Sequence, residues 1–266
     1  MRQAVFTRPC RFQFIVGYLG NTANASGNTM MAPTFLSVNS ETGCTLADLA
    51  VTGYDAPKLI DEEEGEWDGG CAGGDFVLNF LTSSGTLEAR YYWIDDGDSA
   101  AGWYASSMGA AISGGASSIA IPAGQGVWIH GSGMTLQTAG QVNTAIVAKK
   151  MNTSGNTATG NCMPIDHTLG KVYVTGYEAP KLIDEEEGEW DGGCAGGDFV
   201  LNFLTSSGTL EARYYWIDDG DTSAGWYSSS MGAPISGGAT SVAIPAGKGL
   251  WVHGGGMYLN IPAPEL

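Results

Sequence analysis

Carboxylates are concentrated in two identical stretches of the chain. The sequence DEEEGEWDGGCAGGD occupies residues 61–75 and recurs letter for letter at residues 184–198. Seven of its fifteen residues are carboxylates and none is basic. A shorter acidic motif, IDDGD, follows each stretch, at residues 94–98 and 217–221. Flexible loops rich in carboxylates and glycine suit Ca²⁺, which takes about six to eight oxygen ligands.

Calcium binding is one of three interpretations of these loops. The spacing does not match the twelve-residue EF-hand loop. A solvated loop that keeps the protein soluble is the simplest alternative. In the third, acidic loops of one subunit meet basic residues of the next, which lie at the N-terminus and at Lys149 and Lys150. The candidate metal ligands are Asp61, Glu62, Glu64, Asp68, Asp95, Asp96, Asp98, Asp184, Glu185, Glu187, Asp191, Asp218, Asp219 and Asp221.

The five cysteines permit one disulfide bond in each half of the chain. Cys71 and Cys194 occupy equivalent positions in the repeated stretch, and each has one further cysteine upstream, Cys44 or Cys162. We expect Cys44–Cys71 and Cys162–Cys194 bonds, with reduced, partly buried thiols as the alternative. Cys10 is left over, free or intermolecular.

Aromatic side chains offer a second kind of site. Trp67 and Trp103, with their counterparts Trp190 and Trp226, lie among glycine and polar residues. They are candidates to stack on a sugar ring; the alternative is that they close the hydrophobic core. The chain contains no P-loop, Gly-x-Ser-x-Gly or His-Glu-x-x-His motif. We therefore expect a protein without enzymatic activity.

The acidic stretch belongs to a longer duplication. Residues 51–137 match residues 174–260 without gaps at a constant offset of 123, and 13 of the 87 positions differ. A unit of this size is that of an independent domain. We expect an N-terminal extension at residues 1–11, one module at residues 12–142 and a second at residues 143–266.

The pattern of apolar residues predicts an all-β fold. Short runs rich in aromatic and β-branched residues, such as TLEARYYWI at residues 86–94, alternate with Gly-, Ser- and Asp-rich turns. IPAGQGVWIHG at residues 121–131 predicts a hairpin, and TLADLA at residues 45–50 is the one helix candidate. Seven or eight strands per module predict two tandem β-sandwiches or small barrels.

Charge and hydropathy exclude several partners. The chain has 28 Asp and Glu against 11 Lys and Arg, a formal net charge of −17. Such a chain repels nucleic acid and anionic membrane surfaces. No apolar run reaches the roughly 18–20 residues of a membrane span. The first twenty residues do not match a secretory signal peptide.

Both modules end in a related glycine-rich motif. The sequences are IPAGQGVWIHGSGMTLQTAGQV at residues 121–142 and IPAGKGLWVHGGGMYLNI at residues 244–261. In this they resemble tandem repeat modules of secreted bacterial surface and filament proteins. The resemblance implies an extracellular or cell-surface location and a structural or adhesive role.

These features lead us to expect a non-catalytic subunit of an extracellular filament or surface layer that assembles with itself head to tail. The N-terminal segment would supply an apolar strand to a neighbouring subunit, unless that strand pairs within its own module. A glycan-binding adhesin and a virion structural protein are the alternatives. The side chains assigned to the donated strand are Phe12, Phe14, Val16 and Tyr18.

Overall fold

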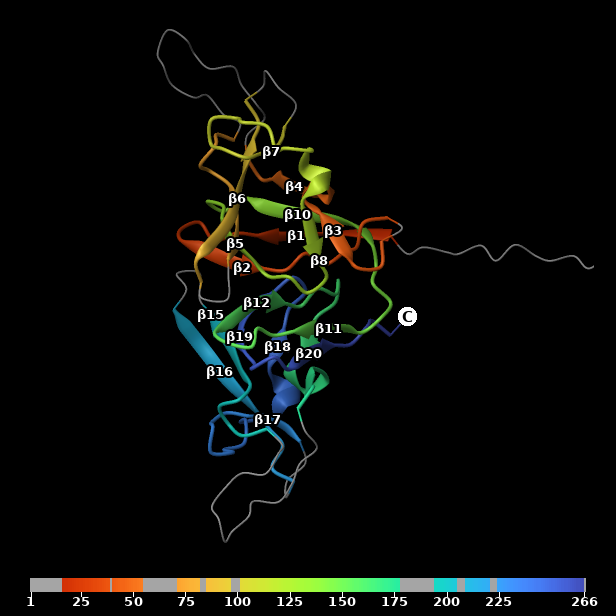
Figure 1. Ribbon diagram of the computed structural model, residues 1–266, viewed down its shortest axis with the longest axis vertical. Helices are drawn as coiled ribbons and strands as arrows, with labels where there is room; N and C mark the ends of the chain where they lie inside the picture. Colours follow the sequence, from red (N-terminus) through yellow and green to blue (C-terminus); the bar gives the residue numbers. More distant parts are fainter. Residues whose placement is uncertain are drawn as a thin grey trace, which may run out of the picture.

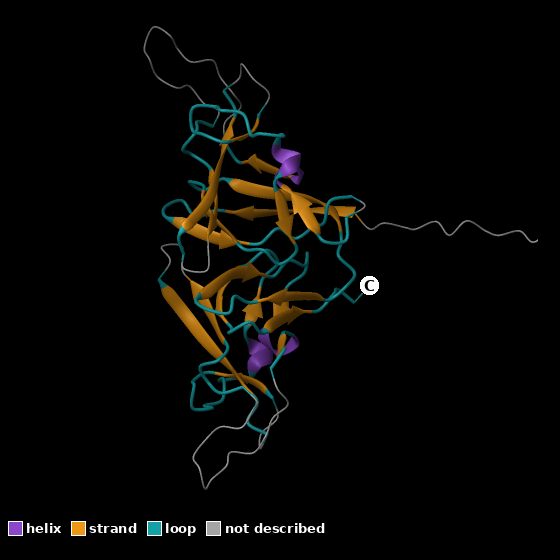
Figure 2. Ribbon diagram, viewed as in Figure 1, coloured by secondary structure: helices purple, strands orange, loops and turns teal. Residues whose placement is uncertain are grey.

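The protein is all-β. Its computed structural model describes residues 16–38, 40–54, 71–81, 85–96, 101–177, 194–204, 209–220 and 224–265. In these ranges the helical elements are four single 3-10 turns, and none is a helix long and apolar enough to cross a membrane. The strands are short and are joined by glycine-rich turns (Figure 2).

The two halves of the described chain contain the same elements in the same order. The strands of the first half are β1 (Val16–Thr22), β2 (Asn28–Met31), β3 (Gly43–Thr45), β4 (Leu49–Thr52), β5 (Val77–Leu81), β6 (Leu87–Ile94), β7 (Gly102–Tyr104), β8 (Ala120–Pro122), β9 (Val127–His130) and β10 (Thr135–Gln141). Those of the second half are β11 (Val147–Lys150), β12 (Asn156–Gly160), β13 (His167–Thr168), β14 (Tyr173–Thr175), β15 (Val200–Leu204), β16 (Leu210–Ile217), β17 (Gly225–Tyr227), β18 (Ala243–Ile244), β19 (Gly249–His253) and β20 (Tyr258–Ile261). The 3-10 turns are η1 (Leu46–Asp48), η2 (Ala116–Ser118), η3 (Leu169–Lys171) and η4 (Ala239–Ser241).

Each half builds three antiparallel sheets of its own. In the first half the strand orders are β1-β10-β4, β2-β9-β5-β6-β7 and β3-β8. The second half repeats them as β11-β20-β14, β12-β19-β15-β16-β17 and β13-β18. Among the described strands, no sheet combines the two halves. The four larger sheets have a propeller-like arrangement and do not resolve into two clear sandwiches, so only the all-β part of the predicted fold is confirmed.

Alternation of side chains places β6 and β16 on the surface of a hydrophobic core. In β6, Trp93 is buried and Tyr91 packs against the core, whereas Glu88 and Arg90 are exposed. This alternation with a period of two is expected for a strand with one face on the core and one face exposed to solvent. Each half has its own core, centred on Phe76 and on its counterpart Phe199, both fully buried.

The halves lie one above the other along the long axis of the molecule and touch reciprocally (Figure 1). Gln125 forms an isolated bridge with Thr159, and its counterpart Lys248 forms one with Met31. Met31 and Thr159 occupy equivalent positions in the two halves. Met31 pairs with Val127, and Thr159 pairs with Leu250, which lies 123 positions after Val127. The same surface of each half therefore contacts the other, as in a two-fold dimer.

The interface is closed by direct backbone and side-chain contacts. The Gly126 N–H donates to the Ala158 carbonyl at 3.1 Å, and the Ala32 N–H donates to the Gly247 carbonyl at 2.9 Å. The Thr159 hydroxyl donates to the Gly124 carbonyl at 2.8 Å. A small apolar cluster that includes residues 147, 162, 163 and 261 packs against Ala123 of the first half.

Two local predictions differ from the structure. The turn at Ala123–Gly126 is present, but β8 and β9 on either side of it do not pair: β8 joins β3, while β9 joins β2 and β5. The expected hairpin is therefore wrong. TLADLA forms only the 3-10 turn η1 before the chain enters β4.

Candidate functional site

The carboxylates proposed as calcium ligands lie largely outside the described residues. This applies to Asp61, Glu62, Glu64, Asp68, Asp98, Asp184, Glu185, Glu187, Asp191 and Asp221. Asp96 and Asp219 are half-buried and have interactions of their own. Within the described ranges, no group of three or more His, Cys, Asp or Glu side chains is placed to hold a metal ion. Calcium binding stays a prediction.

Asp95 has a structural role in the first half. It is buried, and its carboxylate accepts a hydrogen bond from the Tyr54 hydroxyl at 2.8 Å. The Trp93 indole N–H donates to the same hydroxyl at 3.1 Å. Burial, as the largest cause, raises the pKa of Tyr54 to about 12. The backbone of Asp95 also exchanges two hydrogen bonds with Cys71.

The second half repeats this chain of hydrogen bonds. The Trp216 indole donates to the Tyr177 hydroxyl at 3.1 Å, which donates to Asp218 at 2.9 Å. Burial raises the pKa of Tyr177 to about 12. In both copies the carboxylate is thus already engaged by a tyrosine that precedes the acidic stretch, and the backbone of the same aspartate holds the cysteine within that stretch.

The predicted disulfide bonds are absent. Cys44, Cys71, Cys162 and Cys194 are all free and buried. Cys162 belongs to the small cluster at the junction of the halves, whereas Cys194 lies in the core of the second half. Burial, as the largest cause, raises the pKa of each thiol to about 12. Cys10 lies outside the described residues.

The structural counterpart of Cys44 is a histidine. Cys44 pairs with Ile121 in the first half, and His167 pairs with Ile244 at the matching place in the second. His167 is buried, and neither ring nitrogen has a hydrogen-bond partner among the described residues. Burial, then the positive charge of Lys171, lowers the pKa of His167, against smaller opposing effects of the Pro262 carbonyl and Asp166.

Two of the four tryptophans proposed to stack on sugars are core residues. Trp103 is 8% exposed and Trp226 is 7% exposed. Their indole N–H groups donate to the Leu49 carbonyl at 2.8 Å and to the Val172 carbonyl at 2.7 Å. Each ring also packs edge-on against a second tryptophan, with centroids 5.3 Å apart. The stacking prediction is wrong for these two; Trp67 and Trp190 lie outside the described residues.

The strand expected to pass to a neighbouring subunit is paired within its own half. Val16 and Tyr18 lie in β1, which pairs antiparallel with β10 along its whole length, from Val16 opposite Gln141 to Thr22 opposite Thr135. For Val16 and Tyr18 the structure shows the alternative, a strand paired within its own module, whereas donation to a neighbouring subunit stays a prediction. Phe12 and Phe14 lie outside the described residues.

A shallow aromatic groove occurs at the same place in both halves, and the sequence analysis missed it. Groove 1 has a volume of about 260 Å³ and groove 2 about 290 Å³. Every lining residue of one is the counterpart, at an offset of 123, of a lining residue of the other. Groove 1 is lined by Phe80, Glu88, Ala89, Tyr91, Ile119, Ala120, Pro122 and Gln125. Groove 2 is lined by Phe203, Glu211, Ala212, Tyr214, Val242, Ala243, Pro245 and Lys248.

Each groove lies between a large sheet and the short strand β8 or β18. The floor is an edge-to-face pair of rings, Phe80 with Tyr91 at 6.0 Å and Phe203 with Tyr214 at 5.7 Å. Such pairs are a favourable aromatic geometry. The size is below the usual range for a small-molecule pocket, roughly 300–1,000 Å³. It therefore suits a single side chain better than a cofactor.

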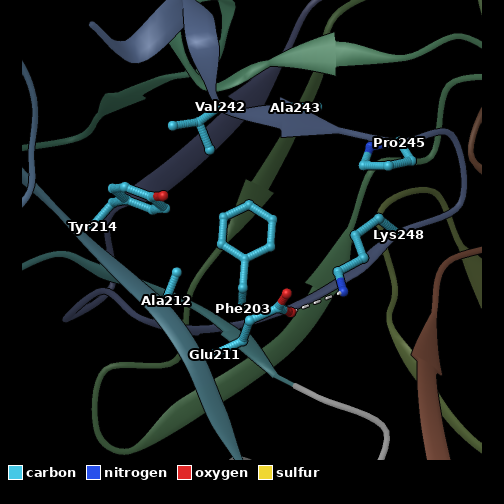
Figure 3. Close-up of a pocket in the computed structure, with 8 residues that line it drawn as sticks. All are labelled: Phe203, Glu211, Ala212, Tyr214, Val242, Ala243, Pro245 and Lys248. Carbon is cyan, nitrogen blue, oxygen red and sulfur yellow. Dashed lines mark ion pairs between the residues drawn. The ribbon is translucent and has the colours of Figure 1, made fainter. Parts of the chain in front are cut away.

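The grooves differ chiefly in one charged residue. In groove 2, Lys248 points toward Glu211 (Figure 3): its ammonium lies 3.9 Å from Glu211 and 5.8 Å from the centre of the Phe203 ring. Its counterpart in groove 1 is Gln125, whose amide oxygen accepts a hydrogen bond from Lys149 at 3.1 Å. The groove could not be predicted from neighbouring residues in the sequence, because the strands that line groove 1, β5, β6 and β8, meet only in the folded chain.

Comparison of the chain with protein-family models, curated proteins and solved structures finds no match to any of them.

Proposed function

We propose that the protein is a non-catalytic, self-associating structural subunit of an extracellular filament or surface layer, in which two copies join through the outer edge of β1. One observation carries the proposal. Strand β1 is an edge strand without a charged residue, and two large side chains project from it into solvent. This replaces strand donation with edge-to-edge pairing.

The exposure of β1 is unusual for a sheet edge. Within the described chain it pairs on one side only, with β10. Its sequence is VGYLGNT, seven residues with no charge and no proline. Val16 is 64% exposed and Tyr18 is 78% exposed. Natural proteins normally protect such an edge with lysine, proline or a bulge, because its free N–H and C=O groups accept another strand.

The second half provides an internal contrast. Its matching edge strand, β11, is four residues long and contains Lys149 and Lys150. When β1 and β11 are aligned by their pairing with β10 and β20, the two lysines occupy the positions of Asn21 and Thr22. One edge therefore has the charges that discourage pairing and the other does not. This favours association through β1 alone.

The geometry of association limits what this contact can build. Antiparallel pairing of β1 with β1 of a second copy is a two-fold contact, and it closes after two subunits. A filament or layer needs a second contact of a different kind. In this proposal residues 12–142 and 143–266 act as two tandem β-domains, with any calcium in the acidic stretches serving cohesion between subunits.

Sedimentation velocity over a range of micromolar concentrations tests the proposal. Tyr18→Lys places a charge on the β1 edge, and we expect it to shift the protein to monomer. The matched control is Ile146→Lys, because Ile146 is the counterpart of Tyr18 and is 54% exposed. It should associate as the unaltered chain does. A chain that is monomeric throughout, or a Tyr18→Lys variant that associates normally, contradicts the proposal.

A further inference from the structure

We propose that groove 1 is the docking site for the arginine- and phenylalanine-rich segment RPCRFQF, residues 8–14, of a second copy of this chain. The inference rests on the self-association proposed above and supplies the second contact that an open assembly requires. It follows from what the same groove does in the second half of the molecule.

Groove 2 shows how this surface accommodates a cation. Lys248 lies at one side of the groove and extends toward Glu211 (Figure 3); its ammonium is 3.9 Å from the Glu211 carboxylate and 5.8 Å from the centre of the Phe203 ring. An ammonium within about 6 Å of the centre of an aromatic ring is attracted to the face of that ring. Phe203 is 6% exposed, whereas its counterpart Phe80 in groove 1 is only partly buried.

Groove 1 has the same walls but lacks the cation. Gln125 lines the groove, but its amide oxygen accepts a hydrogen bond from Lys149 and its amide N–H donates to the Gly126 carbonyl at 2.9 Å. Glu88 is exposed, and no ion pair joins it to a residue in the described ranges. The residues that line groove 1 therefore include aromatic rings and a carboxylate but no Lys or Arg, and the ammonium of Lys149 is bound to Gln125.

The remaining basic residues of the chain identify the occupant. Every Lys and Arg that the structure describes already has a partner. Arg90 and Arg213 donate to Asn79 and Asn202, Lys149 to Gln125, Lys171 pairs with Glu265, Lys248 with Glu211, and Lys150 lies over the ring of Tyr258.

The basic residues outside the described ranges are Arg2, Arg8, Arg11, Lys58 and Lys181. Of these, only Arg11 is followed at once by an aromatic residue, and RPCRFQF combines two arginines with two phenylalanines. Arginine stacks on aromatic faces and pairs with carboxylates better than lysine does. Seven residues in extended conformation span about 25 Å. The chemistry of the segment is thus that of Lys248, supplied by another molecule.

A direct binding experiment tests the inference. A synthetic RPSRFQF peptide, in which serine replaces Cys10 to prevent disulfide formation, is titrated into the full chain by calorimetry. We expect one peptide per chain. Glu88→Gln and Gln125→Lys should each weaken binding about tenfold, since a tenfold change corresponds to roughly 1.4 kcal/mol. Gln125→Lys is the sharper variant, because it turns groove 1 into groove 2.

The second groove provides the matched controls. Glu211→Gln should leave the affinity unchanged, and Lys248→Gln should open groove 2 and raise the stoichiometry to two. A peptide with both arginines replaced by glutamine should not bind. No binding to the full chain, or equal affinity for the Gln125→Lys variant, would overturn the inference.

Failure here is distinguishable from failure of the proposed function. The same titration in the Tyr18→Lys variant measures peptide binding to groove 1 when pairing through β1 is blocked. The peptide should still bind to this variant. Sedimentation of a variant with Arg8→Gln and Arg11→Gln completes the test: it should form closed dimers and nothing larger. Assemblies larger than dimers in that variant would exclude the segment as the second contact.

Discussion

The contact between the two halves predicts a specific response to substitution of Gly126. A Cβ atom at this position would lie 2.6 Å from the Thr159 carbonyl oxygen, 2.7 Å from the Thr159 nitrogen and 2.8 Å from the Ala158 carbonyl carbon. All three are backbone atoms, so no change of rotamer relieves the overlap. Gly126→Ala must therefore push the first half away from β12.

The cost follows from the hydrogen bonds that this movement breaks. They are the 3.1 Å bond from the Gly126 N–H to Ala158 and the 2.8 Å bond from the Thr159 hydroxyl to Gly124. Each contributes a net 0.5–1.5 kcal/mol in typical cases, so we expect a loss of about 1–3 kcal/mol. Gly249→Ala should have a similar effect, since its Cβ would lie 2.5 Å from the Met30 carbonyl carbon.

Urea unfolding followed by tryptophan fluorescence measures this loss, with transitions fitted separately if the halves unfold independently. The control is Gly74→Ala, where a Cβ meets nothing within 4 Å. It should be neutral or slightly stabilising, because alanine restricts the unfolded chain. If Gly126→Ala and Gly74→Ala shift the midpoint equally, the reciprocal interface does not contribute to stability and the reasoning fails.

Three further predictions concern buried side chains. Trp103→Phe should destabilise the protein by about 1–3 kcal/mol in urea unfolding, because it leaves the Leu49 carbonyl without its buried donor; an unchanged midpoint would place that carbonyl in contact with water. The pKa of His167 is lowered in the folded state, so its stabilising contribution is fully present above the unfolded-state pKa near 6.5 and is lost as the pH falls below it. The test variant is His167→Cys, because cysteine is the residue of the first half at that position. Between pH 7 and pH 5 the free energy of unfolding should fall less in this variant than in the unaltered chain, and equal decreases would refute the prediction. The four buried cysteines, with pKa values raised to about 12, should react with a thiol reagent in urea but not in the native protein at neutral pH, and rapid native labelling of all four would contradict their burial.

The sequence was sufficient for features that depend on local pattern. The aromatic and β-branched run TLEARYYWI predicted the strand β6, in which the buried Trp93 and the exposed Arg90 show the period of two of a strand on a core. The fixed offset of 123 predicted the repetition of strands in the two halves. Both signals lie within single segments or in a direct comparison of two segments.

Features that depend on distant partners were not predictable in this way. Trp103 lies between glycine and polar residues, and its burial depends on contacts with the Leu49 carbonyl, 54 positions earlier, and with the ring of Trp93. The turn at Ala123–Gly126 has hairpin chemistry, yet β8 and β9 have better partners in other sheets. The grooves join β5, β6 and β8, and the significance of Gln125 appears only when Lys248 is seen over the ring of Phe203.

Joining two copies in one chain frees each from a constraint that binds ordinary dimers. In a dimer of identical chains, any change on the shared surface appears twice and must suit both sides of the axis. Here the two bridges can hold different residues, and they do: Gln125 in one and Lys248 in the other. A single codon change can therefore close one groove while its twin stays open. Because both halves are encoded in one chain, the two groove surfaces can change independently of each other, and the difference between them is inherited.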